Sequence, residues 1–153
     1  MTGTRLLGLD LGERRIGVAI ADPDAGARPL ATLVRRQRLD LDAASLAELV
    51  TRHDVAELVV GLPLDMRGTE GPQAVATRAW AEAIAARLGL PLTLRDERLS
   101  SHVAESRLGP PKRGRAGGPP SHAQRDARRG RIDREAAAII LQDEIDARRK
   151  AAT

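Results

Sequence analysis

The sequence predicts an α/β protein with a five-stranded mixed sheet covered by helices. Three observations lead to this fold class. The chain begins with three short apolar segments separated by turn residues, as in an antiparallel meander. Two later apolar segments each follow a segment with helical spacing, and strands reached through a helix pair in parallel. The 153 residues, 42% of them hydrophobic, suffice for one domain with a real core.

The first two strands are expected at residues 5–9 and 16–20, joined by a tight polar turn. Gly12 in this turn can adopt the positive φ that a hairpin turn needs. Asp10 ends the first strand, and small residues beside it leave room for a metal ion or a phosphate to approach the backbone. An aspartate that only caps the turn is the alternative interpretation.

The middle of the chain is expected to alternate strands and helices. A third strand at residues 28–34 is followed by a helix over residues 43–52, with Asp40 or Asp42 as its N-cap. The continuous apolar run at residues 57–61 is typical of a parallel strand that is covered on both faces. This fourth strand is therefore expected in the interior of the sheet.

A second helix and the fifth strand follow. Thr69 is expected to cap a helix that ends near Leu88, with Gly89 in the C′ position. The fifth strand is expected at residues 90–94, and a short helix after it ends at Leu108.

Residues 109–130 hold five glycines and four prolines among the arginines, without hydrophobic periodicity. We expect a flexible loop there. A last helix with one apolar edge is expected over residues 132–149. Residues 1–153 are thus interpreted as a single domain with a flexible basic loop at about 109–130.

The composition excludes several classes of function. The chain has no Cys, so it has no disulfide framework, thiolate zinc site or Cys nucleophile. No apolar run approaches a membrane span and the N-terminus lacks a signal-like segment, so we expect a cytoplasmic protein without a membrane partner. Trp80 is the one aromatic residue and is most simply a core anchor. Nucleic-acid binding would then rest on phosphates and shape, with little base stacking.

Positive charge is concentrated in one segment. The net charge is +4, but residues 109–134 alone carry +6 and the remainder carries −2. Only two of the 25 basic residues are lysine, and arginine forks suit phosphate. A polyanionic partner or a solvated Arg-rich surface would both account for this charge. The candidate nucleic-acid-binding residues are Arg14, Arg15, Arg98, Lys112, Arg113, Arg115, Arg128, Arg129 and Arg131.

Three acidic residues are placed where ligands gather in such a sheet. Asp10 ends the first strand, Glu97 follows the fifth, and Asp133 opens the last helix. Oxygen ligands without Cys favour Mg²⁺ or Mn²⁺, and two such ions can promote phosphodiester hydrolysis. Each acid also has a structural alternative: Asp133 as a helix cap and Glu97 as a surface ion-pair partner. Asp65, after the fourth strand, is a further ligand candidate or a turn residue.

Five sequence blocks resemble the YqgF-type family, which is described both as Holliday junction resolvases and as pre-16S ribosomal RNA nucleases. They are residues 10–19 (DLG and RRIGVA around Glu13), 59–64 (VVGLPL), 68–72 (GTEGP), 96–101 (DERLSS) and 132–142 (IDREAAAIILQ). In the family's order they cover most of residues 5–145. The resemblance implies a ribonuclease-H-like fold, with Asp10, Glu97 and Asp133 as the catalytic and metal-binding acids.

The function expected first is a metal-dependent endonuclease in the 5′-end maturation of pre-16S rRNA, with Mg²⁺ or Mn²⁺ as cofactor. Its partners would be precursor rRNA and ribosomal particles. A Holliday junction resolvase, acting on branched DNA by the same chemistry, is the alternative enzyme. An actin-like sugar kinase also opens with a DxG hairpin, but such kinases pair two similar halves. A non-catalytic RNA-binding module would explain the basic charge equally well.

Overall fold

The five strands form one sheet in the order β3-β2-β1-β4-β5. The computed structural model describes residues 4–22, 24–98 and 100–153, without the side chains of residues 100–102 and 115. β2 is antiparallel to both β1 and β3, whereas β4 is parallel to both β1 and β5. The predicted mixed five-stranded sheet is confirmed. The strands are β1 (Arg5–Leu11), β2 (Arg15–Asp22), β3 (Gly26–Val34), β4 (Val55–Leu62) and β5 (Leu92–Asp96).

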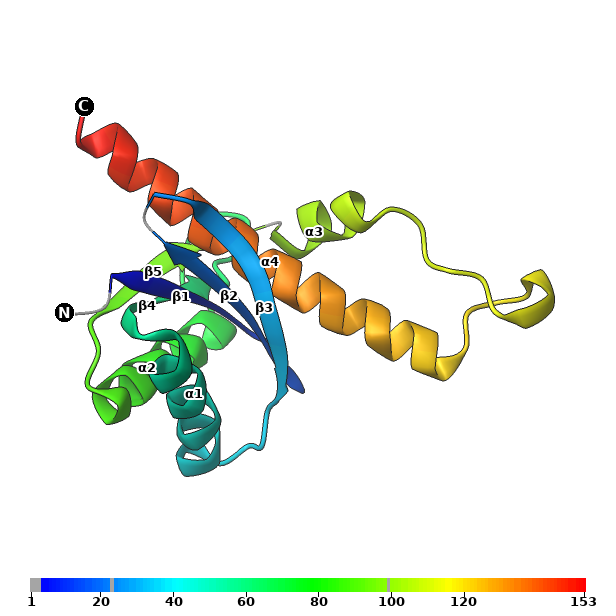
Figure 1. Ribbon diagram of the computed structural model, residues 1–153, viewed down its shortest axis with the longest axis horizontal. Coiled ribbons are helices and arrows are strands. Elements are labelled where there is room, and N and C mark those ends of the chain that lie inside the picture. Colours follow the sequence, from blue (N-terminus) through cyan, green and yellow to red (C-terminus); the bar gives the residue numbers. More distant parts are fainter. Residues whose placement is uncertain (1–3, 23, 99) are drawn as a thin grey trace.

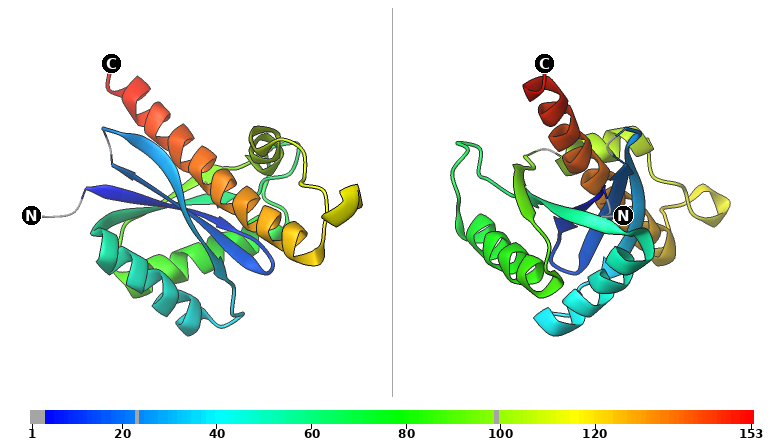
Figure 2. Two further views of the ribbon diagram at one scale, coloured as in Figure 1. Left: turned by 45° about the vertical axis from the view of Figure 1, so that its right-hand side comes forward. Right: turned by 60° about the vertical axis from the view of Figure 1, so that its left-hand side comes forward.

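Helices cover both faces of the sheet. Helices α1 (Leu39–His53) and α2 (Pro72–Leu88) pack on one face, and α4 (His122–Ala151) crosses the other (Figures 1 and 2). The short helix α3 (Ser100–Leu108) packs beside α4. The fold is therefore three layers deep, and β1 lies in the middle of the central layer.

Alternation along β1 assigns its side chains to the two faces. Leu7 and Leu9 belong to the core beneath α1 and α2, which also contains Trp80 as expected. Leu6 belongs to the smaller core beneath α4. Because successive side chains of a strand point to opposite faces, Asp10 shares the α4 face with Leu6.

The predicted aspartate cap of α1 is wrong. The helix begins at Leu39, and Arg38 is its N-cap without a side-chain cap bond. Asp40 and Asp42 lie inside the first turn, where acids are favourable to the helix dipole. The buried Asp42 carboxylate accepts a hydrogen bond from the backbone N–H of Arg36, so it anchors the preceding loop instead.

The predicted Thr69 cap of α2 is also wrong. The helix begins at Pro72 after Gly71, and Thr69 donates its hydroxyl to Asp65 in the loop that precedes the helix. Asp65 also accepts the backbone N–H of Arg67, so it organises this loop. The C-terminal prediction is confirmed, because Gly89 ends α2 in the left-handed conformation with φ of 67°.

Helix α4 starts ten residues before the predicted position, so the prediction that residues 122–130 belong to a loop is wrong. The irregular segment is residues 109–121, interrupted by the turn η1 (Arg115–Gly117). Ser121 and Gln124 form a capping box at the start of α4. Although α4 has 30 residues, no helix in the described ranges is long and apolar enough to cross a membrane.

Candidate functional site

Glycines flank Asp10 on the two neighbouring strands. Asp10 pairs with Gly17 of β2 in the antiparallel register. On its other side Leu9 pairs with Val60 of β4, so that Gly61 follows beside Asp10. Asp10 is therefore surrounded by backbone without side chains on the face that α4 covers.

Gly61 allows Glu97 to cross β4. A Cβ atom at Gly61 would lie only 2.6 Å from Oε2 and 3.0 Å from Cβ of Glu97. Glu97 follows the end of β5, where its backbone N–H donates to the carbonyl of Leu62 at 3.2 Å. Its side chain extends over Gly61 and reaches the carboxyl group of Asp10, with which it shares a hydrogen bond.

Gly17 brings α4 directly onto the sheet. A Cβ atom at this position would lie 2.0 Å from the carbonyl oxygen of Asp133. Since Gly17 is the cross-strand neighbour of Asp10, this contact places Asp133 beside Asp10. The small residues beside Asp10 were predicted to leave space for a metal ion or a phosphate. At Gly17 the backbone of α4 fills that space.

Asp10 and Glu97 behave as one coupled pair of carboxyl groups. Burial raises the pKa of Asp10, the hydrogen bond from Glu97 opposes this, and the charge of Asp133 raises it further. Burial, followed by the charge of Asp10 and the hydrogen bond to it, raises the pKa of Glu97 to about 10. At neutral pH Glu97 therefore keeps its proton and donates a hydrogen bond to the Asp10 carboxylate.

Asp133 forms an ion pair with Arg15. Nε of Arg15 donates to Oδ2 of Asp133 at 2.6 Å, and the same guanidinium lies 3.9 Å from Asp126. Within the described ranges, no group of three or more His, Cys, Asp or Glu side chains is close enough to hold a metal ion. The structure thus joins two of the predicted acids and places the third beside them; the three-carboxylate centre stays a prediction.

The donor set suits a divalent cation. In the described part of the chain, neither Asp10 nor Glu97 has a Lys, Arg or His nitrogen within 4.0 Å. Two enclosed carboxyl groups without a cationic partner are hard oxygen ligands of the kind that Mg²⁺ and Mn²⁺ prefer. Asp133 could join them once Arg15 turns away.

A polar cavity of about 350 Å³ opens beside Asp133. It is lined by Arg14 of the β1–β2 turn, by Arg15 at the start of β2 and by Arg129 of α4. Three guanidinium groups beside the acidic residues can hold a phosphate group by charge-assisted hydrogen bonds. All three arginines were candidates from the sequence, but no sequence pattern indicates that they surround one cavity.

The turn between β1 and β2 differs from its prediction. Gly12 has no positive φ. Its N–H donates to the carbonyl oxygen of Arg15 at 2.8 Å, and a Cβ atom would lie 2.9 Å from that oxygen. Glycine is needed here because two backbone segments approach closely. This contact shapes the wall of the polar cavity.

The other candidate basic residues lie farther out. Arg98 pairs with Asp96 at 2.8 Å, so Asp96 is an ion-pair partner outside the coupled pair. Arg113 donates to the carbonyl of Gly117 at 3.2 Å, and the side chain of Arg115 lies outside the described part. Lys112 and Arg128 line a second cavity on α4, which they share with Arg129, and Arg131 lines a third with Arg15 and Arg134.

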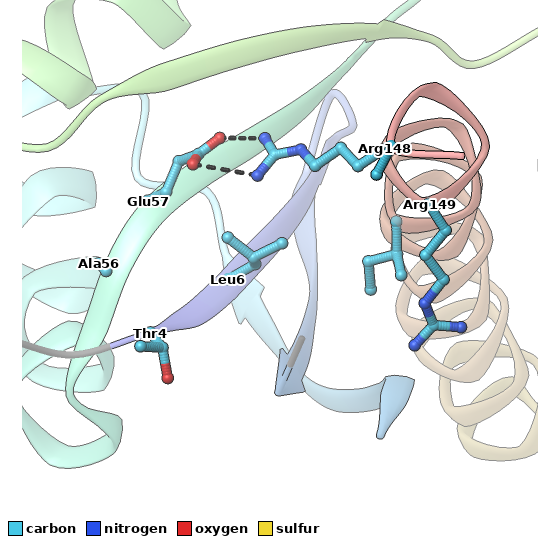
Figure 3. A pocket seen from close by; sticks show the side chains of 8 residues that line it. Thr4, Leu6, Ala56, Glu57, Arg148 and Arg149 are labelled. Atoms are coloured by element: carbon cyan, nitrogen blue, oxygen red, sulfur yellow. Dashed lines mark hydrogen bonds and ion pairs between the residues drawn. The ribbon is translucent and has the colours of Figure 1, made fainter. Parts of the chain in front are cut away.

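Another cavity, of about 460 Å³, lies at the opposite end of the sheet, between the start of β1 and the C-terminal end of α4. Figure 3 shows Leu6 at its base and Glu57 facing Arg148. Glu57 is bound by Arg148 and accepts a hydrogen bond from Thr93, so its carboxylate is already neutralised. The lining is mainly apolar, and this cavity is not a candidate for acid chemistry.

Comparison with known proteins identifies the family. A model of the RuvX family, described as Holliday junction resolvase, matches residues 4–147. A protein of Anaeromyxobacter dehalogenans named "Putative pre-16S rRNA nuclease" is 48% identical over 94% of this chain and 98% of its own length. A protein of Chloroflexus aggregans with the same name is 43% identical over 97% and 98% of the two chains.

Solved structures agree on the fold. RuvC of Thermus thermophilus in complex with a Holliday junction substrate superimposes with a TM-score of 0.52 over 95% of this chain and 96% of that one. Its 18% identity supports the expected ribonuclease-H-like fold and nothing further. With a family match over nearly the whole chain and relatives above 40% identity, the chain belongs to the RuvX/YqgF family.

Proposed function

We propose that this protein is a metal-dependent endonuclease that hydrolyses phosphodiester bonds in precursor 16S rRNA. The observation that carries the proposal is the juxtaposition of the Asp10–Glu97 pair and Asp133 with a cavity lined by three arginines. The names of the curated relatives support the substrate. Hydrolysis of a phosphodiester needs both features, because anionic phosphate must be held next to groups that would otherwise repel it.

The arginines bind and orient the substrate. Arg14 of the β1–β2 turn and Arg129 of α4 both line the cavity. Arg15 is shared between this cavity and Asp133. A phosphate group that enters would compete with Asp133 for the Arg15 guanidinium. Substrate binding would thereby free the Asp133 carboxylate at the moment when phosphate is in place.

The acids hold the cofactor and the proton. Asp10, Glu97 and Asp133 would bind Mg²⁺ or Mn²⁺, which supplies Lewis-acid activation of the phosphate and of the attacking water. Glu97 must lose its proton to act as an anionic ligand, and a nearby cation favours that loss. Asp10 is already the acceptor of the Glu97 hydrogen bond and needs no rearrangement.

Cleavage of two substrates tests the proposal. A precursor 16S rRNA fragment and a four-way DNA junction are each incubated with the purified protein and Mg²⁺, with Asp10→Asn as the control. We expect cleavage of the rRNA fragment, lost in the variant. The description of the matching family favours the junction as the second candidate. Preferential cleavage of the junction would transfer the function to DNA, and cleavage of neither would reject the nuclease.

A further inference from the structure

A second basic cavity lies on α4, away from the acidic residues. It has a volume of about 300 Å³ and is enclosed by α3, the loop of residues 109–121 and the N-terminal half of α4. In Figure 1 the first turns of α4 extend beyond the sheet toward the loop. Four cationic side chains line the cavity: Lys112, Arg125, Arg128 and Arg129.

The charges in this cavity are poorly compensated. The carboxylate of Glu105 is the one acid among its lining residues, and it lies 3.8 Å from Arg128. In the described part of the chain no carboxylate oxygen lies within 4.0 Å of Lys112, Arg125 or Arg129. Arg125 is held in place by donating to the carbonyl of Pro120 at 2.6 Å. Like charges around one hollow repel each other, and a bound anion relieves that repulsion.

Helical spacing connects this cavity to the candidate active site. Arg125, Arg129 and Asp133 are each four residues apart, so they follow one face of α4 in steps of about 6 Å. Arg129 lines both cavities. A chain of phosphates that passes Asp133 can therefore continue along α4 into the second cavity, about 12 Å away at Arg125.

We propose that Lys112, Arg125 and Arg128, together with Arg129, form a second binding site for a backbone phosphate of the same nucleic-acid strand, outside the scissile phosphate. The inference rests on the proposed function. Arginine forks match phosphate oxygens, and four cationic side chains facing one acid favour an anionic ligand over an uncharged peptide. The site lies to one side of the acids, so the protein should need extra nucleotides on one side of the cleavage position only.

The double variant Lys112→Ala/Arg125→Ala tests the site. It leaves Arg129 in place, because Arg129 lines both cavities. The matched control, Arg52→Ala/Arg87→Ala, removes the same charge from α1 and α2 across the sheet. Dissociation constants for single-stranded RNA are measured against salt in the Asp10→Asn background. We expect the cavity variant to lose at least about fivefold in affinity and about 1.4 units of salt slope, whereas the control changes little. Lys112→Arg/Arg125→Lys keeps both charges and should retain most of the affinity.

Oligonucleotide length gives a second readout. Shortening the RNA from one end should weaken binding to the Asp10→Asn protein in one step, and the cavity variant should lack that step. Equal losses in the cavity and control variants would overturn the proposal, because they indicate only general charge. Unchanged RNA binding with lost binding of an acidic peptide would overturn it in favour of a protein partner. If the full chain binds RNA in this way but cleaves none, the proposed nuclease fails while the phosphate site stands.

Discussion

Gly61 is the residue on which the Asp10–Glu97 pair depends. Any side chain there would occupy the path of Glu97 across β4. We predict that Gly61→Ala lowers cleavage by at least about 100-fold, because it separates two groups that must act together. The free energy of unfolding should fall by about 1–3 kcal/mol, since the ends of the Glu97 and Ile140 side chains can turn aside but Cβ of Glu97, 3.0 Å away, can move only with its backbone. Single-turnover cleavage and thermal unfolding measure the two effects.

The control for this variant is Gly71→Ala, where a Cβ atom would have no neighbour within 4 Å. This substitution should leave cleavage within about twofold of wild type, apart from a small loss of stability at the start of α2. Full activity of Gly61→Ala would show that Glu97 does not need to contact Asp10.

The coupled carboxyl pair should also make stability depend on pH. The folded state keeps the Glu97 proton up to a pKa of about 10, whereas the unfolded chain releases it near 4.5. Between these values the folded protein binds more protons than the unfolded one, so metal-free stability falls as pH rises, by up to about 1.4 kcal/mol per pH unit. Glu97→Gln keeps the size of the side chain and removes this titration.

Chemical unfolding in the presence of a chelator checks this prediction. We expect Glu97→Gln to be more stable than wild type at about pH 8 and close to it at about pH 4, where the carboxyl group is protonated in both states. Parallel stability curves for the two proteins would mean that Glu97 is ionised in the folded protein.

At the scale of elements, Gly17 sets the distance between α4 and the sheet. A Cβ atom there would meet the backbone of α4 at Asp133, which cannot turn aside as a side chain does. We therefore predict that Gly17→Ala lowers the free energy of unfolding by about 1–3 kcal/mol and shifts Asp133 away from Asp10. Gly130→Ala in α4 is the matched control: its Cβ would make ordinary contacts, and it should stabilise the helix by about 0.5–1 kcal/mol. Equal unfolding midpoints for the two variants would contradict this account.

The start of α4 shows where sequence patterns stop being informative. Its first two turns are mostly exposed, and it meets the sheet at Gly130, whose carbonyl accepts a hydrogen bond from Thr32 of β3. These first turns therefore need no apolar stripe and show no helical period. The sequence signal that could have located the start is Ser121 with Gln124 three residues later, the spacing of a capping box. Strand order and the pairing directions were predictable, because the spacing of apolar residues and the helical crossovers both constrain them.

The candidate site was predictable in its acids and not in its geometry. Strand ends led to Asp10 and Glu97, an expected helix start led to Asp133, and the resemblance to a family implied all three. Asp133 lies inside α4, so the expected helix start was wrong although the residue does lie beside Asp10. That Glu97 reaches Asp10 depends on the register of β5 against β4, which a local pattern does not specify. The pairing of Arg15 with Asp133 likewise depends on where α4 crosses β2.

At the scale of the whole molecule, the positive charge of the α4 region and the acidic residues of the site would act on the proposed nucleic-acid ligand with opposite sign. Under the proposed function, the net charge of +4 would attract nucleic acid over long distances, where salt screens it. The acids repel phosphate at short range until a cation neutralises them. Variants that change the same charge at different places can separate these two contributions.

Asp10→Asn and Asp24→Asn each remove one negative charge. The first lies at the site, and Asp24 lies in the turn after β2, at least about 15 Å from Asp10 along the strand. In a chelator at about 0.1 M salt, where the screening length is about 10 Å, we predict that Asp10→Asn binds RNA at least as tightly as wild type, while Asp24→Asn is indistinguishable from it. At low salt both variants should bind RNA more tightly than wild type, because the charge at position 24 is then no longer screened from the RNA. Addition of Mg²⁺ should tighten binding by the wild type and by Asp24→Asn more than by Asp10→Asn, since only the first two keep the full set of acids. Fluorescence anisotropy over a salt series measures all four conditions. Weaker metal-free binding by Asp10→Asn would mean that this carboxylate contacts the nucleic acid directly, and the division between affinity from arginines and chemistry from acids would have to be abandoned.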